Sequence, residues 1–148
     1  MKFKFYLTFL LISFTFSVFS HEIEIGDKSI DEIVKLRMKN MSTISSLSKK
    51  IYKNLNFADF KKLNENTIRL KHNITEFKEL FPENSIGGKA NKIIWEDKEL
   101  FNEYIEVFLK DVDLMIQDIE NQDLTSLNNN FNRMTSNCGT CHKKFKSR

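Results

Sequence analysis

Apolar side chains recur at intervals of three and four residues along most of this chain, which is the spacing of one face of an α-helix. The first such stripe covers residues 30–55, and only Arg37 and Ser48 interrupt it with polar side chains. The second stripe covers residues 60–81 and is followed by Pro82, which cannot continue a helix. No segment shows the alternation that predicts a β-strand. The pattern therefore predicts an all-α protein.

Two further stripes complete the pattern. One covers residues 101–119 after Asp97, and the other covers residues 124–145 after Asp123, so each follows an aspartate suited to cap a helix. Residues 82–97 hold the only proline and form the one long connection. Four amphipathic helices joined in this way predict a four-helix bundle. A coiled-coil rod is the alternative, but the long connection and the polar breaks in the stripes disfavour it.

The composition supports one domain of ordinary size. Hydrophobic residues make up 41% of the 148 residues and charged residues 29%. With only 4 Gly and 1 Pro, the chain is poor in the residues that build a turn-rich sandwich or barrel. The formal net charge of +3 is small for this length, so we expect no binding to nucleic acid.

The first twenty residues have the plan of a secretory signal peptide. Two lysines precede an uncharged apolar run that ends in small residues. Cleavage after Ser20 leaves a domain over residues 21–148 in the periplasm, with no membrane insertion once the signal is removed. A membrane anchor is the alternative, but the apolar run over residues 5–19 is shorter than the roughly 20 residues that a spanning helix needs.

The last predicted helix ends with the residues that are the best candidates for binding a cofactor. Cys138, Cys141 and His142 form the C-x-x-C-H pattern of covalent c-type haem attachment. Positions i, i+3 and i+4 share one helix face, so the two thiols can form thioethers with the vinyl groups of a haem. The imidazole on the same face can then bind the iron. The sequence thus predicts one covalent haem c.

Two other uses of the cysteines have to be weighed against haem. A disulfide or a redox-active C-x-x-C motif has the same local pattern, but redox motifs of the thioredoxin type sit in a βαβ context, which this sequence lacks. A structural zinc site needs four ligands, and only His21 and His72 lie outside the motif as further candidates. We expect His72 to face solvent, since it falls between inner positions, and His21 to be the first mature residue.

The chain resembles the cytochrome c-prime family, the class II c-type cytochromes. The resemblance covers nearly all residues after the signal and rests first on a C-x-x-C-H motif at the carboxyl end of a bundle. The connection over residues 80–95, with its Leu-Phe-Pro, Gly-Gly and Ile-Trp elements, is similar to the central loop of the family. A third match is Arg37, four residues before Met41.

This resemblance implies roles for Arg37 and Met41. In the family, the arginine approaches a haem propionate, and the residue at the place of Met41 faces the iron opposite the histidine. The position of Arg37 is consistent with a propionate contact, because an arginine on an apolar helix face is costly unless an anion pairs with it. The alternative is that Met41 is an ordinary core methionine. Met38, which lies off the stripe, and Met134 are weaker candidates for iron ligation.

The expected function is that of a soluble periplasmic electron carrier of the low-spin, Met-ligated branch, with His142 and Met41 as axial ligands. Such a protein is no enzyme and has no catalytic residue. The alternative is a five-coordinate, high-spin protein that binds nitric oxide or carbon monoxide, in which Met41 packs without ligating. A third hypothesis is a bundle without haem that serves as an interaction module.

The basic residues near the motif indicate a partner surface. Residues 131–148 contain five basic side chains and no acid, which predicts steering of an acidic redox partner; ordinary solvated charges are the alternative. The five are Arg133, Lys143, Lys144, Lys146 and Arg148. The family commonly has arginine where this chain has Lys146, which keeps the charge but loses the planar fork. The resemblance further implies a homodimer through the first two helices, and we expect Phe145 to pack against haem or a neighbouring helix.

Overall fold

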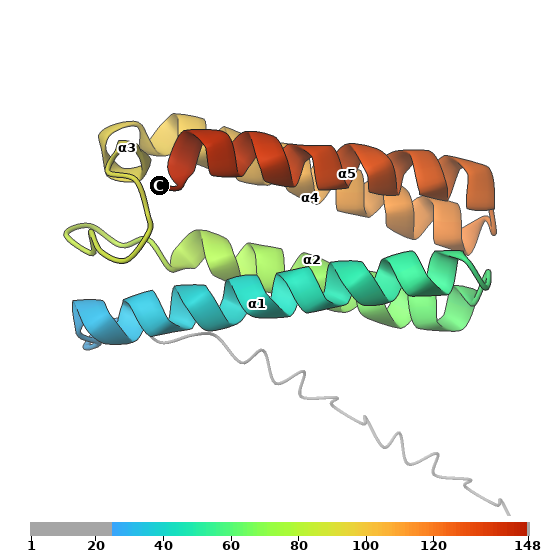
Figure 1. Cartoon of the computed structure of the whole chain (residues 1–148), viewed down its shortest axis with the longest axis horizontal. Helices are drawn as coiled ribbons and strands as arrows, with labels where there is room; N and C mark the ends of the chain where they lie inside the picture. The colour runs from blue at the N-terminus through green and yellow to red at the C-terminus, as the bar shows by residue number, and fades with distance from the viewer. Residues whose placement is uncertain (1–24, 148) are drawn as a thin grey trace, which may run out of the picture.

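The computed structural model describes residues 25–147, and the predicted signal peptide, His21 and Arg148 lie outside them. Four long helices form a bundle, and a fifth, short helix lies in the connection between the second and third of them (Figure 1). Their bounds are α1 Ile30–Leu55, α2 Phe60–Glu79, α3 Ile93–Glu96, α4 Lys98–Glu120 and α5 Leu124–Phe145. The predicted all-α four-helix bundle is thus confirmed, and α3 is a small addition to the predicted connection.

Side chains cap the helices by accepting hydrogen bonds from backbone amides that have no partner within the first turn. The predicted caps Asp97 and Asp123 each accept a hydrogen bond from a backbone amide three residues on, and Asp59 caps α2 in the same way. Ser29 forms a reciprocal capping box with Glu32 at the start of α1. Helix α2 ends at Glu79, earlier than the stripe predicts, because the residue before a proline disfavours helical backbone.

The bundle is made of two helix pairs. Helix α1 packs on α2 and α4 packs on α5, while α2 and α4 pack against each other and join the pairs (Figure 1). The inner stripes meet in a continuous apolar core. Its fully buried members include Leu47, Ile51, Leu63, Leu70, Ile74, Phe101, Val112, Met115, Leu127 and Met134. Within residues 25–147, no helix has the length and apolar character needed to span a membrane.

Three successive carbonyl groups after α2 each accept a hydrogen bond from a side chain of a different helix; we call residues 80–82 the carbonyl cluster. The pairs are Leu80 with Arg37 of α1 at 2.7 Å, Phe81 with Lys98 of α4 at 2.7 Å, and Pro82 with Trp95 of α3 at 2.8 Å. The chain leaving α2 is therefore held from three sides, which sets the start of the long connection.

The rest of the connection is held against α1 and against the end of α5. Gly88 has φ +64°, and an added Cβ would lie 2.9 Å from Val34 Cγ1, so glycine is needed there. Residues 89–91 then pair with residues 145–147, through one antiparallel bridge and two backbone hydrogen bonds of 2.9 Å. The segment after the C-x-x-C-H motif and the central connection therefore lie side by side.

Candidate functional site

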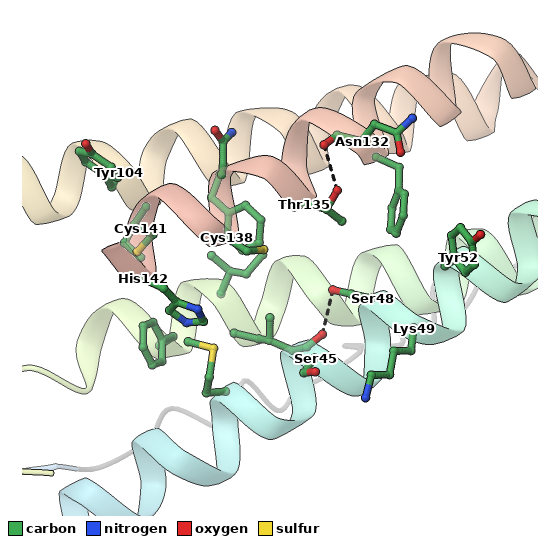
Figure 2. Close-up of a pocket in the computed structure, with 18 residues that line it drawn as sticks. Ser45, Ser48, Lys49, Tyr52, Tyr104, Asn132, Thr135, Cys138, Cys141 and His142 are labelled. Carbon is green, nitrogen blue, oxygen red and sulfur yellow. Dashed lines mark hydrogen bonds between the residues drawn. The ribbon is translucent and has the colours of Figure 1, made fainter. Parts of the chain in front are cut away.

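Two cavities lie between the α1–α2 pair and the α4–α5 pair, with volumes of about 590 Å³ and about 710 Å³. Each falls in the usual range of pockets that hold small molecules, about 300–1,000 Å³. Figure 2 shows residues that line the first cavity. Five residues border both cavities and so mark their junction: Met41, Ser45, Phe77, Cys141 and His142.

The predicted haem-attachment residues come together on the last turns of α5. Cys138 and Cys141 are half-buried free thiols, not joined in a disulfide, and His142 projects from α5 toward α1 (Figure 2). Burial and the neighbouring Cys138 raise the pKa of Cys141 to about 11. Burial likewise raises the pKa of the Cys138 thiol. Both sulfurs are therefore neutral thiols at pH 7.

The imidazole is in the form that binds a metal. Although His142 is exposed as a residue, partial burial of its ring lowers the imidazole pKa, and the charge of nearby Lys146 lowers it further. A neutral imidazole offers a free nitrogen lone pair, which is the donor that iron requires. No cluster of three or more His, Cys, Asp or Glu side chains within residues 25–147 forms a separate metal site of the zinc type.

Met41 lies at the junction of the cavities, as this imidazole does. It is half-buried on α1 and borders both cavities together with His142. Met38 is 69% exposed and borders only the second cavity, and Met134 is fully buried and borders neither. Of the predicted methionine candidates, Met41 alone shares both cavities with the histidine.

Arg37 is a buried cation with incomplete pairing. Only 6% of its surface is exposed, and burial lowers its pKa to about 10, so it still carries its charge at pH 7. Nε donates to the Leu80 carbonyl at 2.7 Å and Nη2 donates to Ser85 Oγ at 2.5 Å. The guanidinium lies 4.4 Å from the ring centre of Phe81 and 5.1 Å from that of Trp95.

The third guanidinium nitrogen of Arg37, Nη1, has no hydrogen-bond partner within residues 25–147 and could bind an anion. Nη1 is buried without a hydrogen-bond partner, and no acid in the described part of the chain pairs with this guanidinium. A buried cation needs a counter-charge. Arg37 borders the second cavity only, so a carboxylate held there can supply it.

The two cavities together fit a haem in the chemistry of the residues that line them. Cys138 borders only the first cavity and Arg37 only the second, while Cys141, His142 and Met41 border both. Haem carries vinyl groups on one edge and anionic propionates on another. The thiols therefore suit one edge, the unpaired cation suits the other, and the imidazole lies between them.

Comparison with known families decides which proteins share this arrangement. Residues 32–146, nearly the whole bundle, match the family described as Cytochrome C'. The chain belongs to the cytochrome c′ family. Members bind one covalently attached haem c with its iron, and the only two cysteines of this cytochrome c′ are those of the motif. The hypothesis of a bundle without haem is therefore not supported.

Solved structures agree on the fold. A recombinant native cytochrome c prime from Alcaligenes xylosoxidans is 20% identical with a TM-score of 0.76, and the match covers 81% of this chain and 98% of that one. A nitric oxide complex of a variant of that protein matches with the same values. A carbon-monoxide-bound variant matches with a TM-score of 0.77 at the same identity and coverage. No curated protein sequence matches significantly.

One member of the predicted basic cluster of this cytochrome c′ was assigned wrongly. Arg133 does not offer a free charge, because its Nε donates to the carboxylate of Asp111 at 2.6 Å. Asp111 is 3% exposed and also accepts a bond from Asn137 at 2.6 Å, so it ties α5 to α4 beside the motif. Lys143, Lys144 and Lys146 are exposed, as expected.

Two other expectations are confirmed, and two charged residues of the cavity lining were missed by reasoning from the sequence. Phe145 is buried with its ring centre 5.3 Å from Phe101, and His72 is exposed. Lys49 and Lys89 border the cavities but were not predicted. The position of Lys49 could be predicted from the sequence, because it continues the i, i+4 series from Met41 through Ser45 on one helix face. The position of Lys89 could not be predicted, because only the folding of the connection brings it to the cavity.

Proposed function

We propose that this cytochrome c′ is a periplasmic monohaem protein that binds nitric oxide or carbon monoxide at its iron. Cys138 and Cys141 hold the haem covalently, His142 is the protein ligand of the iron, and Arg37 meets a propionate. Met41 packs on the opposite side without ligating. The bound haem supplies an iron that accepts a diatomic ligand, and no residue of the chain acts as a catalyst.

The observation that carries this proposal is the character of the side that faces His142. Met41 is the residue of α1 that borders both cavities beside Ser45, and the neighbouring walls contain the apolar side chains of Ile44 and Phe77. Polarity and hydrogen-bond donors near the iron decide which ligands a haem binds. A wall that is mainly apolar, with Ser45 as the polar residue bordering both cavities, suits nitric oxide and carbon monoxide, which bind without a strong hydrogen bond from the protein.

The solved structures support the same choice. The Alcaligenes protein with the same fold is described in complexes with nitric oxide and with carbon monoxide. The thioether of Met41 is a neutral group on a flexible, unbranched side chain, so it can move aside for a small ligand without breaking an ion pair. Ligand entry then costs only the displacement of apolar contacts.

Electron transfer with Met41 as the sixth ligand is the second candidate. It is favoured by one observation, that Met41 and His142 border both cavities from opposite helices. Methionine ligation raises the reduction potential of a haem and lets the iron change charge without changing ligands. The two candidates differ only in whether the sulfur is bonded to the iron.

Visible spectra of the purified holoprotein separate these candidates. We expect the reduced protein to show broad, high-spin bands that shift when carbon monoxide is added. Met41→Leu is expected to leave the resting spectrum unchanged, because leucine fills similar space without a sulfur. Met38→Leu is the matched control, since Met38 is 69% exposed. Methionine ligation would be established instead by two results together. The parent would show sharp low-spin bands that do not change when carbon monoxide is added, and Met41→Leu would show high-spin bands.

Export is part of the proposal, because covalent haem c is attached outside the cytoplasm. The predicted signal over residues 1–20 supports it. Mass spectrometry of protein recovered from the periplasm is expected to give a chain that begins at His21. A mass that includes the first twenty residues would contradict cleavage. The homodimer through α1 and α2 stays a prediction, which sedimentation equilibrium of the holoprotein tests.

A further inference from the structure

The charged side chains that line the two cavities are all basic. No aspartate or glutamate borders either cavity in the part of the chain that the structure describes. The basic residues are Arg37, Lys49, Lys89 and Lys146. Arg37 is buried and turned to the interior, whereas the three lysines are exposed. The formal charges that line the haem site are therefore all positive among the residues that the structure describes.

We call Lys49, Lys89 and Lys146 the seam lysines, and the surface along the two adjoining cavities the seam: Lys49 borders the first cavity, and Lys89 and Lys146 border the second. Lys49 extends outward from α1 (Figure 2), and the antiparallel bridge between Ala90 and Lys146 brings the segment that contains Lys89 against the segment that contains Lys146. None of the three takes part in an ion pair among residues 25–147. Their charges are thus free to act on a molecule in solution.

The same seam has an apolar side chain at the surface. Met38 is 69% exposed and borders the second cavity, which Lys89 and Lys146 also border. A small apolar centre with a polar rim is the usual anatomy of a protein interface. An acid-free rim selects a partner whose own rim is acidic. The seam also leads to Cys141 and His142, so a docked protein lies next to the haem attachment.

We propose that this seam is the docking face for an acidic one-electron-transfer protein that reduces the iron. This inference rests on the proposed function, because carbon monoxide binds ferrous and not ferric haem. In the docked complex the reduced partner gives up one electron, its own centre is oxidised by one unit, and the ferric iron becomes ferrous. No bond to hydrogen is made or broken in this step.

Stopped-flow reduction of the ferric holoprotein tests the docking face. The probe is a reduced plant-type ferredoxin, a small acidic one-electron carrier. We expect the second-order rate constant to fall steeply as ionic strength rises. The triple variant Lys49→Gln, Lys89→Gln, Lys146→Gln is expected to lose about tenfold in rate at low ionic strength, the low end of electrostatic steering, and most of its salt dependence.

A matched control removes the same charge elsewhere. Lys61 and Arg69 of α2 and Lys110 of α4 are exposed and border neither cavity, so Lys61→Gln, Arg69→Gln, Lys110→Gln has the same net charge as the seam variant. We expect its rate to stay within about twofold of the parent, because the charge is lost from helices that carry none of the seam lysines. Equal losses in the two variants, or a rate that ignores salt, would overturn the docking face.

A measurement without electron transfer locates the contact. Gallium-substituted ferredoxin cannot exchange electrons, so its addition to isotope-labelled holoprotein reports binding alone. We expect amide shifts around Lys49 and in residues 87–91 and 142–147, which the seam variant abolishes. Shifts confined to α2 would contradict the inference. The carbon monoxide spectrum of the seam variant separates the two proposals, since failure of docking with a normal carbon monoxide shift leaves the proposed function intact.

Discussion

Replacement of Arg37 by methionine tests whether an anion meets this buried cation. Arg37→Met keeps an unbranched chain of similar length and removes the charge together with the hydrogen bonds to Leu80 and Ser85. The measurement is unfolding of the ferric holoprotein in guanidinium chloride, followed by far-ultraviolet circular dichroism. Because the haem is covalent, it stays with the chain throughout, and the free energy of unfolding reports the site rather than cofactor loss.

The sign of the effect depends on the propionate. If a propionate pairs with Arg37, removal of the cation leaves that anion buried and alone, which costs about 3–5 kcal/mol. The Leu80 carbonyl, which belongs to a fully buried residue, also loses its charged donor, and such a bond contributes about 1.5–3 kcal/mol. These terms overlap, so we expect a total loss of about 3–5 kcal/mol in the free energy of unfolding.

A conservative variant separates charge from geometry. Arg37→Lys keeps the positive charge but not the planar fork that reaches two acceptors, so we expect a smaller loss of about 1–2 kcal/mol. An Arg37→Met protein as stable as the parent, or more stable, would refute the reasoning. That result is expected for a buried cation without an anion, whose removal relieves a desolvation cost of several kcal/mol.

Three further substitutions follow from packing and pairing. Phe101→Ala removes a side chain that is 1% exposed and touches the rings of Phe81 and Phe145, and we expect urea unfolding to show a loss of about 3–5 kcal/mol. Gly88→Ala should cost about 1–3 kcal/mol, part of which Val34→Ala restores; a Gly88→Ala protein of parental stability contradicts the close approach. Asp111→Ala should cost about 1–3 kcal/mol, and a double-mutant cycle with Arg133→Gln should show coupling, whereas strict additivity would argue against the ion pair.

The long helices were predictable because each buries one continuous stripe. The stripe over residues 30–55 marks α1 at both ends, and Asp97 and Asp123 mark the starts of α4 and α5 because their carboxylates cap the first turn. The capping box of Ser29 with Glu32 follows a known local signature as well. The end of α2 was predicted less well, since the effect of proline on its neighbour outweighs an apolar residue in the stripe.

The site was predictable only in part. Cys138, Cys141 and His142 lie within five residues, so helix geometry alone brings them together. Arg37 and Met41 are one helical turn apart, but that Met41 and the histidine border the same cavities depends on how α1 and α5 are placed in the bundle. The ion pair of Arg133 with Asp111 and the bridge between Ala90 and Lys146 depend on contacts between segments far apart in sequence. Local sequence patterns cannot predict contacts of this kind.

The carbonyl cluster has a consequence for how the protein opens. Donors from α1, α3 and α4 converge on consecutive carbonyls of residues 80–82, so none of these helices can separate at this end without breaking a bond to the same short segment. Segments tied in this way open as one cooperative unit in native-state hydrogen exchange. The amides of α3 and of the first turns of α4 should therefore share one opening free energy. The turn between α1 and α2, which is held by local bonds, should exchange by independent fraying.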